Sequence, residues 1–543
     1  VISRLLANPG ILMAERNYRR CLFEVPNDPG FEDQNNLEDY YDHDIDAPEA
    51  WDIIHDANGV RVAVIDSGID YGHPDLRENI WFNEGEDLEP DPNDPNSTAV
   101  MGEYNPNDVN NEDDDGNGFE DDFFGWDFGG DSASSDSDDD NDPNDFNSHG
   151  THVAGIIGAV GNNGIGIAGV SWNATMMAIK TSGDDGDGSS YISDLIEAID
   201  YAIDNEANVI NASWGGPGFS QAMYDIIKRA GNKDIILVAA AGNGDEEGNG
   251  FNIDAQPVYP AAYDLDNIIT VMATDQYDNI AGFSNYGSIA VDIAAPGVSV
   301  YSTTPREASD HMLDEDISPM YASMQGTSMA APHVTGAVAL MWSVDPELTI
   351  GQIKTVLMAS SDKVLPEGYC ASNGRLNLFR ALKMIRKGAV VNDTTGTLYD
   401  SIQQAVNTAG DGHVIVVQDE NWYFENVNLG TKNIRVVSGK VSTDPVSAQI
   451  SPNRSDTYIS GLLQGDRFSD PNLPLVTYAG SQDANSTLYG FTVQYGGLDG
   501  VLASGGIEIE DASPVIQDCI VEKCLNVLDG GAVSVTGSSG PQF

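Results

Sequence analysis

The sequence predicts an α/β domain built around a parallel sheet, followed by a second domain of short, stacked β-strands. From Val60 to Leu382, short apolar runs such as RVAVID and DIILVAAAG alternate with longer helical patterns such as SDLIEAIDYAID, which is the order of βαβ units. After about Ile385 come one amphipathic helix, LYDSIQQAVNTAG, and short strands separated by glycines. Such repeating strands favour the rungs of a parallel β-helix.

Composition divides the chain further. Residues 1–26 hold a basic tract, 27–385 the α/β domain, 386–397 a linker, and 398–543 the β-helix domain, which we expect to be truncated. Inside the α/β domain, residues 84–147 are rich in Asp, Glu, Asn and Gly and contain no Lys or Arg. Charge repulsion would disorder such an insertion unless a bound cation held it together, so we expect a cation there.

The charge balance and the cysteines exclude several classes of protein. The chain has 543 residues with 24 Lys and Arg against 86 Asp and Glu, a formal net charge of −62. Nucleic acid is excluded as a partner, because phosphate binding requires clustered basic side chains. No apolar run is long enough to span a bilayer, so no membrane span is expected. Cys21, Cys370, Cys519 and Cys524 are too few and too scattered for a disulfide framework or a zinc site.

Three short motifs carry candidate chemistry. The first, VAVIDSGID, ends an apolar run in Asp66 and so places a carboxylate at the carboxyl end of a buried strand, where α/β proteins form their sites. An aspartate that caps the following turn would give the same local pattern. The second, SHGTHVAGIIGAVG, opens a closely packed helix with His149 and His152. This pair lacks the third ligand and the adjacent Glu of a zinc hydrolase, so we interpret His152 as a packed, hydrogen-bonded histidine.

The third motif, GTSMAAPHVTGAVALMW, places Ser328 at the start of a helix, where a serine is usually an N-cap. A helix N-terminus also presents backbone N–H groups to a developing oxyanion, and a hydroxyl there is a nucleophile when a histidine removes its proton. The three motifs together predict that Asp66 orients His149, which deprotonates Ser328. Asn243, at the end of AAAGN, follows a predicted strand and would donate to the same oxyanion.

These motifs and the SWGG segment occur in the order found in subtilisin-like serine proteases, and the chain resembles that family over about residues 27–385. The resemblance implies a three-layer parallel-sheet domain and a serine endopeptidase that cleaves protein or peptide substrates through an acyl-enzyme. It also implies that Asp66, His149 and Ser328 are the catalytic triad, with Asn243 as oxyanion donor. The substrate would add as a strand beside the cleft. The implied cleft residues are Ser213, Trp214, Gly215, Gly216, Ala241 and Gly242.

The acidic insertion contains a candidate calcium loop. In DDDGNGFEDD, acidic and amide side chains alternate before a glycine, a spacing that curls a loop so that several oxygens converge on a hard cation. The pattern resembles the start of an EF-hand loop, but Phe124 stands where the bidentate Glu would be. A solvated acidic loop is the alternative. The predicted ligands are Asp113, Asp115, Asn117, Phe119, Asp121 and Asp122, and a second acidic run offers Asp138, Asp140, Asp142 and Asp145.

The resemblance also implies a further calcium site and an inhibitory segment. Residues 1–26 resemble the end of a propeptide, which in this family occupies the cleft as an intramolecular inhibitor before it is cut off. The acidic surplus fits a saline or calcium-rich exterior, so we expect a secreted or cell-surface enzyme. The implied ligands of the further calcium site are Gln34, Asp75, Asn163 and the carbonyls of Ile165 and Ile167.

The C-terminal domain resembles right-handed β-helices of the pectate-lyase type. No arrangement of carboxylates and basic residues there requires a second active site, so we expect a structural or polysaccharide-binding role. The leading hypothesis is therefore a secreted, calcium-stabilised serine endopeptidase with an appended β-helix. The alternative is an adhesive or glycan-binding β-helix protein with the protease as its processing unit. A catalytically inactive scaffold is disfavoured, because every catalytic motif is intact.

Overall fold

The computed structural model describes most of the α/β region and parts of the C-terminal region. Residues 1–24 of the basic tract, residues 87–108 and 131–138 of the acidic insertion, residues 386–389 and most C-terminal loops lie outside the described residues. The predictions made for those segments therefore stay predictions. The described residues are 25–86, 109–130, 139–184, 186, 188–245, 247–315 and 317–385, and beyond residue 389 the strands and the helix given below with short stretches beside them.

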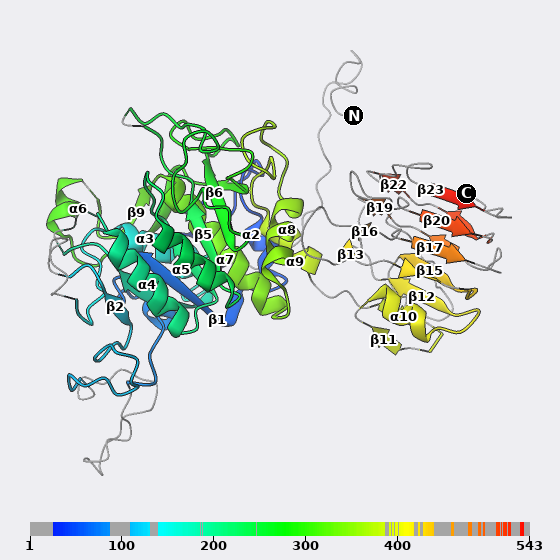
Figure 1. The fold of residues 1–543 in the computed structure, drawn as a ribbon, viewed down its shortest axis with the longest axis horizontal. Helices are drawn as coiled ribbons and strands as arrows, with labels where there is room; N and C mark the ends of the chain where they lie inside the picture. The colour runs from blue at the N-terminus through cyan, green and yellow to red at the C-terminus, as the bar shows by residue number, and fades with distance from the viewer. Residues whose placement is uncertain are drawn as a thin grey trace, which may run out of the picture.

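Within the described residues, a seven-stranded parallel sheet forms the centre of the α/β domain (Figure 1). The strands are β1 (Asp56–Asp66), β2 (Gly125–Asp127), β3 (Asn173–Lys180), β4 (Val209–Ala212), β5 (Ile236–Ala240), β6 (Ile268–Thr274) and β7 (Ile293–Pro296). Their order is β2-β3-β1-β4-β5-β6-β7, and every neighbouring pair is parallel. This sheet agrees with the α/β class that the sequence predicts.

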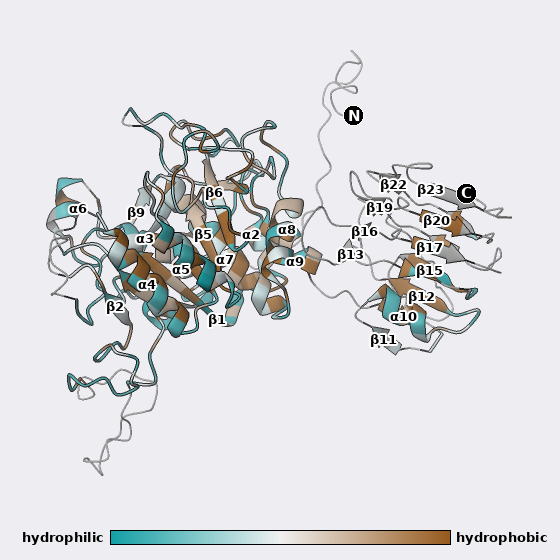
Figure 2. Ribbon diagram, viewed as in Figure 1, coloured by the Kyte–Doolittle hydropathy of each residue, from teal (hydrophilic) through white to brown (hydrophobic). Residues whose placement is uncertain are grey.

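Helices cover both faces of the sheet, which gives three layers. The described helices of the domain are α2 (Ala47–Trp51), α3 (His149–Gly158), α4 (Ile192–Asp204), α5 (Gln221–Gly231), α6 (Asp310–Asp314), α7 (Thr327–Val344), α8 (Ile350–Ser360) and α9 (Leu378–Ile385), with the 3-10 turns η1 (Phe31–Asp33) and η2 (Arg77–Asn79). Along β1, Val62 and Val64 pack in one core with α3 and α7, whereas Ala63 and Ile65 pack in the other with α4 and α5. In Figure 2, α4 and α5 carry both hydrophobic and hydrophilic residues, as helices with one solvent-exposed face do.

Helix α7 is buried on all sides from Thr327 to Trp342. It packs against β1 and β4 to β7, and its many Ala and Gly residues let it lie close to the sheet. A two-stranded antiparallel hairpin, β8 (Val300–Thr304) with β9 (Met320–Met324), packs against α3 through β8. Among the described residues, no helix combines the length and the apolar composition that crossing a membrane requires.

From β12 onward the described strands pair in parallel. Three series of paired strands run β12-β15-β18-β21, β13-β16-β19-β22 and β14-β17-β20-β23, so each strand pairs with the one three strands later. The elements are α10 (Ile402–Thr408), β12 (Val414–Val417), β13 (Trp422–Tyr423), β14 (Val427–Asn428), β15 (Arg435–Ser438), β16 (Tyr458–Ser460), β17 (Val476–Ala479), β18 (Thr487–Tyr489), β19 (Thr492–Gln494), β20 (Ile507–Glu510), β21 (Val515–Gln517), β22 (Ile520–Glu522) and β23 (Val533–Thr536).

One strand lies inside the stretch 386–397 that the sequence predicts to be a linker. Strand β10 (Val390–Asn392) pairs antiparallel with β11 (Thr397–Tyr399) and with β12. The reason is apolar burial, since Val390 is 0% exposed and belongs to the C-terminal core. This strand does not stand out in the sequence, because an apolar pair between turn-forming residues is too short to show a strand pattern, and the bounds of the linker stay a prediction.

Candidate active site

The predicted catalytic residues converge at one edge of the central sheet. Asp66 is the last residue of β1, Ser213 directly follows β4, and Asn243 lies just beyond β5. Because β1, β4 and β5 are parallel neighbours, their carboxyl ends meet at this edge. Helices α3 and α7 begin there as well, with His149 as the first residue of α3 and Ser328 as the second residue of α7.

The side chains of His149 and Asp66 form a hydrogen bond of 2.7 Å between Nδ1 and Oδ1. Asp66 Oδ1 also accepts from the backbone N–H of Ser67 at 2.8 Å, while Oδ2 is buried with no partner among the described residues. The Asp66 side chain is 4% exposed and that of His149 is 32% exposed, so a buried carboxylate holds an accessible imidazole. Burial by itself lowers the pKa of His149, but the carboxylates of Asp66 and Asp145 outweigh it and raise the pKa above its ordinary value.

Asp145 fixes the first turn of α3. Its carboxylate accepts hydrogen bonds from three backbone N–H groups between residues 147 and 151, and from the hydroxyls of Ser67 and Thr151. A carboxylate at a helix N-terminus satisfies N–H groups that lack helical partners. The sequence offers Asp145 as a calcium ligand of the second acidic run, but these bonds use its oxygens to position the helix that carries His149.

A proline in α7 ties the backbone of Ser328 to the neighbouring segment. Pro332 has no N–H, so the carbonyl of Ser328, four residues earlier, lacks its helical donor. The hydroxyl of Ser213 donates to this carbonyl instead, at 2.9 Å. The hydroxyl of Ser328 donates to the carbonyl of Ser213 at 3.1 Å, and the described structure shows no hydrogen bond between it and His149. Catalytic hydrogen bonds of this kind often form only when substrate is bound.

The side-chain amide of Asn243 is oriented by Thr327. Asn243 Oδ1 accepts from the backbone N–H of Thr327 at 2.8 Å and from its hydroxyl at 3.0 Å. Because a backbone N–H only donates, these bonds identify the amide oxygen and leave Nδ2 to donate elsewhere. The Thr327 hydroxyl also accepts from the N–H of Gly242 at 3.0 Å. Sequence patterns did not identify Thr327, although it directly precedes Ser328.

The segment Ser213–Gly216 leaves one edge free. Gly216 exchanges two backbone hydrogen bonds, each of 2.9 Å, with Tyr259. Successive residues of an extended strand direct their backbone groups to alternate edges, so Gly215 faces the edge opposite Tyr259. A Cβ at Gly215 would lie 3.0 Å from the Tyr259 carbonyl oxygen, which explains why a glycine stands here.

The other predicted cleft residues are held by neighbouring strands and loops. Trp214 donates its indole N–H to the Ile65 carbonyl at 3.0 Å. The Ala241 carbonyl accepts from Asn285 Nδ2 at 3.0 Å. Gly242 has a φ of 95°, and a Cβ there would approach the same amide nitrogen to 2.7 Å. The turn before Asn243 is therefore held in place by the side chain of Asn285.

His152 is a buried structural residue, as the sequence predicts. It is 0% exposed, and Nε2 donates to the carbonyl of Ala322 at 3.1 Å. Burial lowers the pKa of His152 to about 3, so the imidazole is uncharged at neutral pH. It therefore serves the packing of α3 against the β8–β9 hairpin.

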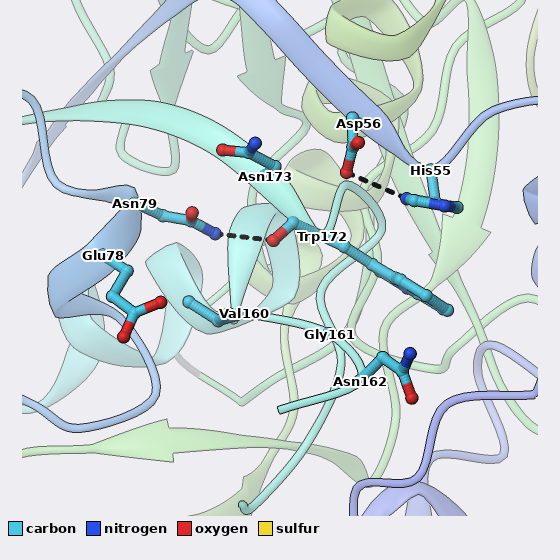
Figure 3. Close-up of a pocket in the computed structure, with 9 residues that line it drawn as sticks. All are labelled: His55, Asp56, Glu78, Asn79, Val160, Gly161, Asn162, Trp172 and Asn173. Atoms are coloured by element: carbon cyan, nitrogen blue, oxygen red, sulfur yellow. Dashed lines mark hydrogen bonds and ion pairs between the residues drawn. The ribbon is translucent and has the colours of Figure 1, made fainter. Parts of the chain in front are cut away.

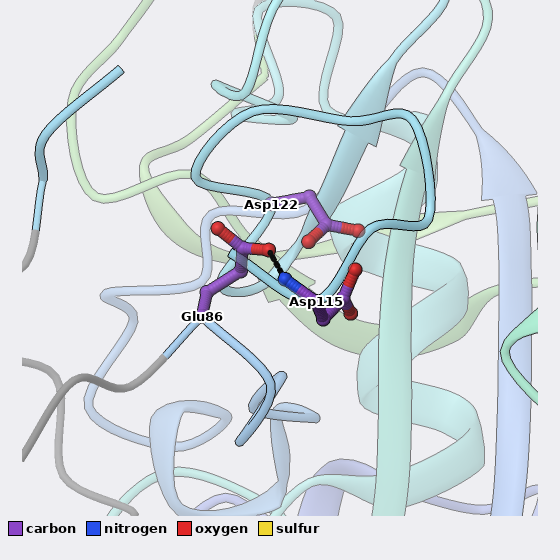
Figure 4. Close-up of side chains that lie close together, drawn as sticks. All are labelled: Glu86, Asp115 and Asp122. Carbon is purple, nitrogen blue, oxygen red and sulfur yellow. Dashed lines mark hydrogen bonds between the residues drawn. The ribbon is translucent and has the colours of Figure 1, made fainter. Parts of the chain in front are cut away.

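Three carboxylates gather in the described part of the acidic insertion (Figure 4). Glu86, Asp115 and Asp122 each offer an oxygen, and these oxygens all lie within 4.8 Å of one another. Burial raises the pKa of Glu86 to about 7 and that of Asp122 to about 6. Asn117 donates its amide to Asp115 and Asp122 at 3.2 and 3.1 Å. Converging carboxylates with poorly solvated charge fit a hard divalent cation.

The remaining predicted ligands of this loop have other partners. Asp113 accepts from three backbone N–H groups of residues 116–118, and Asp121 accepts from the N–H groups of residues 110 and 111. The ring of Phe119 lies in an aromatic cluster. The structure thus joins Asp115 and Asp122 of the predicted loop with Glu86, which no local spacing could have indicated.

A second buried group is centred on the carboxylate of Asp75, which is 0% exposed. Its Oδ1 accepts from the amide of Asn163 at 2.8 Å, and its Oδ2 accepts from the Ile167 N–H at 2.9 Å. Burial raises the pKa of Asp75 to about 6. The side-chain amide of Gln34 is hydrogen-bonded through both of its atoms to the backbone of Ala168, the residue after Ile167, at 2.8 and 2.9 Å, and its role as a ligand stays a prediction.

Asp28 lies beside the loop that carries Asn163. Its carboxylate accepts from three successive backbone N–H groups of residues 162–164, at 2.6 to 3.0 Å, and its charge contributes to the raised pKa of Asp75. The Ile165 N–H donates to the side-chain oxygen of Asn163 at 2.6 Å. A cluster of buried carboxylates with no basic residue among these contacts again fits a divalent cation.

The pocket in Figure 3 lies away from the candidate active site. It has a volume of about 420 Å³, and its wall includes Asp56, the first residue of β1. Asp66 is the last residue of the same strand, so the pocket is at the opposite end of β1. The pocket is lined by His55, Asp56, Glu78, Asn79, Val160, Gly161, Asn162, Trp172 and Asn173.

One edge of the sheet thus brings together a serine at a helix start, a hydrogen-bonded histidine–aspartate pair and an oriented asparagine amide. This arrangement is characteristic of the class of serine hydrolases. Comparison with known proteins gives the family. The profile of the subtilase family (Peptidase_S8) matches residues 57–381, which is more than half of the chain. The chain belongs to the subtilase family, and it is a serine endopeptidase.

Individual relatives agree with this assignment. The chain is 34% identical over 387 residues to a thermophilic serine proteinase of Bacillus sp. (strain AK1), covering 70% of this chain and 75% of the relative. It is also 34% identical over 359 residues to thermitase of Thermoactinomyces vulgaris, covering 66% and 99%. A solved protease structure from Pseudoalteromonas arctica PAMC 21717 is similar with a TM-score of 0.50 and 28% identity, covering 66% of this chain and 99% of that one.

The Thr327 contacts generate a prediction. Thr327→Val keeps the shape of the side chain but removes the hydroxyl that bonds Asn243 and Gly242. We expect kcat to fall about tenfold with KM nearly unchanged, less than the roughly 10²–10³-fold loss when an oxyanion donor itself is removed. Thr327→Ser keeps the hydroxyl and serves as the control. Equal kcat values for Thr327→Val and the parent, measured on a short peptide substrate, would show that the hydroxyl does not position Asn243.

Proposed function

We propose that Asp66, His149 and Ser328 form the catalytic triad of this serine endopeptidase, and that Asn243 donates to the oxyanion. The observation that carries the proposal is the 2.7 Å hydrogen bond between His149 and Asp66 at the edge where Ser328 begins α7. The raised pKa of His149 supports its role as the base, because a more basic imidazole accepts a proton more readily. The orientation of the Asn243 amide supports its role as a donor.

The reaction proceeds through an ester on Ser328. Ser328 Oγ attacks the scissile carbonyl carbon while its proton passes to Nε2 of His149. Asp66, bonded to Nδ1–H, keeps Nε2 free to accept that proton and stabilises the imidazolium. Asn243 Nδ2 and a backbone N–H at the start of α7 donate to the oxyanion. The C–N bond then breaks as His149 protonates the leaving amine, and water hydrolyses the ester by the same proton transfers.

The substrate backbone adds as a strand at the free edge of Ser213–Gly216. The carbonyl of Ser213 lies 3.1 Å from the Ser328 hydroxyl, so the strand begins beside the scissile bond. Gly215 faces the free edge and supplies backbone groups that pair with the substrate. Ala241 and Gly242, whose turn Asn285 holds, form the opposite wall of the cleft.

Calcium ions stabilise the loops of this enzyme in our proposal, and they take no part in the chemical step. Glu86, Asp115 and Asp122 would hold one ion, since their oxygens converge within 4.8 Å. Asp75 and Asp28 would hold another, with the loop at Asn163. The positive charge would stabilise the ionised forms of Glu86, Asp75 and Asp122, whose pKa values are raised by burial and, to a lesser extent, by neighbouring carboxylates.

The flanking segments have proposed roles of their own. The enzyme is secreted or attached to the cell surface, which its net charge of −62 supports. Residues 1–26 are the remnant of an inhibitory propeptide, residues 27–385 the catalytic domain, and residues 398–543 a right-handed parallel β-helix. The regular pairing of each C-terminal strand with the third strand after it supports the β-helix. A polysaccharide-binding β-helix with the protease as its processing unit is the alternative function.

Replacement of Ser328 tests the proposal. We expect Ser328→Ala, supplied with the same propeptide as the parent, to lose hydrolysis of casein and of chromogenic peptides by about a million-fold or to the detection limit. Circular dichroism of both proteins establishes that the variant is folded. Comparable turnover by the variant and the parent would exclude Ser328 as the nucleophile. Glycan binding by the full chain, without proteolysis by a folded parent, would favour the alternative function.

Removal of calcium gives a second prediction. The experiment uses the Ser328→Ala background, which prevents self-digestion. We expect calcium to raise Tm and EDTA to reverse the increase. A free calcium concentration of 100 times Kd stabilises the folded state by about 2.7 kcal/mol. The double variant Glu86→Gln with Asp122→Asn should lose part of this increase. Glu112→Gln, which alters an exposed carboxylate in the same loop, is the matched control. An identical calcium response in all of these proteins would contradict the proposed site.

A further inference from the structure

Three tyrosines on the surface of the α/β domain are left almost fully in water. Tyr40 and Tyr41, in the segment between η1 and α2, are 81% and 71% exposed, and Tyr277, in the turn after β6, is 63% exposed. Burying such rings would lower the free energy of the folded chain. Large exposed apolar groups gathered on one surface therefore mark a site of interaction.

The three tyrosines and His43 form a continuous aromatic row. The ring centroids of Tyr40 and Tyr41 lie 5.1 Å apart in an edge-to-face arrangement, and those of Tyr41 and His43 lie 6.1 Å apart in a stacked one. The His43 ring meets the Tyr277 ring edge to face at 6.5 Å. These distances are those of favourable aromatic pairs, so the row joins two segments that are far apart in the sequence.

A buried arginine holds these two segments in place. Arg375 is 1% exposed, and its guanidinium donates to the backbone carbonyl of Asp42 at 3.2 Å and forms an ion pair with Asp278. Asp42 and Asp278 have φ angles of 69° and 61°, a left-handed conformation that costs free energy in residues other than glycine. The turns are therefore fixed by the structure beneath them, and the aromatic row is ordered before a partner binds.

Carboxylates lie beside the aromatic row. Glu38 and Asp42 are exposed on either side of the two adjacent tyrosines. Asp39 Oδ2 lies 3.4 Å from Nδ1 of His43 and accepts from the backbone N–H of Tyr41 at 3.0 Å. The surface thus presents aromatic rings and negative charge together, on a chain whose formal net charge is −62.

This combination selects a guanidinium group. A cation over the face of an aromatic ring is attracted by the ring quadrupole, and arginine makes this contact more often than lysine because its planar guanidinium is weakly hydrated. The same group forms paired hydrogen bonds with carboxylates. A second copy of this acidic chain would be repelled, and a neutral partner would leave the carboxylates without a counter-charge.

We propose that the aromatic row is an exosite, a surface outside the cleft, which binds an arginine-rich segment of a protein substrate. The inference rests on the endopeptidase activity of the proposed function, but it concerns residues that belong neither to the triad nor to the cleft segments. A substrate held at the exosite has its cleavable bonds at a raised local concentration, so KM falls while kcat is unchanged.

The first experiment measures binding without cleavage. In the Ser328→Ala background, fluorescence anisotropy gives Kd for a labelled twelve-residue peptide with four arginines and for the same peptide with glutamine in their place. We expect the double variant Tyr40→Ala with Tyr41→Ala to bind the arginine peptide about five- to thirtyfold more weakly, since each exposed cation–π contact contributes about two- to fivefold. Asp42→Asn removes a charge but tolerates the left-handed backbone, and should weaken binding about two- to fivefold.

Tyr191→Ala, which removes a tyrosine that is 55% exposed in front of α4, is the matched control and should bind as the parent does. Circular dichroism and Tm establish that the variants are folded. Equal Kd values for the parent and the double variant, or equal binding of the glutamine peptide, overturn the inference. A double variant that loses only the binding of a neutral polysaccharide also overturns it, because the aromatic row would then be a glycan site.

The second experiment tests whether the bound segment belongs to a substrate. A quenched fluorogenic peptide with one cleavable bond carries the arginine or the glutamine segment after a Gly/Ser linker of forty residues, whose average span is about 35 Å. We expect the active enzyme to cleave the arginine substrate with a KM about five- to thirtyfold lower and an equal kcat, and the double variant to cleave both substrates alike.

Equal KM values for the two substrates in the active parent enzyme overturn the exosite. A folded parent that cleaves neither peptide contradicts the proposed function and removes a protein substrate as the occupant. The binding measured in the first experiment distinguishes this failure from a failure of the aromatic row to bind arginine.

Discussion

The close approach of α3 to the end of β1 is the contact on which the rest of the candidate site depends. A Cβ on Gly150 would collide with the carbonyl oxygen of Gly68 and lie 3.1 Å from Cβ of Asp66, so only a glycine lets the first turn of α3 come this near. This approach places His149, the preceding residue, at 2.7 Å from Asp66. The sheet order contributes as well, because β1 lies next to β4. The strand that ends in Asp66 therefore lies beside the strand that leads to Ser213.

A second constraint joins Ser328, the proposed nucleophile, to the proposed cleft segment through one missing helical hydrogen bond. Pro332 cannot donate to the Ser328 carbonyl, so the Ser213 hydroxyl donates to that carbonyl instead. Asn211 then donates to that hydroxyl at 3.0 Å, and Thr335, one turn farther along α7, donates to Asn211 at 2.8 Å. The bonds are buried, and leaving any polar group in them without a partner would cost about 1–3 kcal/mol. The position of the substrate strand is thus coupled to the helix that supplies the serine.

The sequence predicts those parts of the molecule that depend on neighbouring residues. The parallel α/β sheet follows from alternating apolar runs and helical patterns, and the candidate catalytic residues are recognisable because each lies where an apolar strand ends or a helix begins. The metal-binding candidates are different, because they depend on how the loops close in space. Glu86 comes 29 residues before its partner Asp115 in a region where carboxylates are common, so no spacing distinguishes it. Asp28 and Gln34 are both polar residues near the start of the domain, and only the structure shows that Asp28 contacts the loop at residues 162–164 whereas Gln34 contacts Ala168.

The central claim, that His149 activates Ser328, is tested most directly by the rate at which a sulfonyl fluoride modifies the enzyme as a function of pH. The reagent forms an S–O bond with Ser328 Oγ, fluoride leaves, and the proton passes to neutral His149. Since the carboxylates of Asp66 and Asp145 raise the pKa of His149, the account predicts one adduct per chain, located on Ser328 by peptide mass spectrometry, with a rate that rises through a midpoint above 6.5. Asp66→Asn should slow the reaction and move the midpoint to lower pH. Modification at another residue, or a rate on Ser328 that does not depend on pH between 5 and 9, would contradict the account.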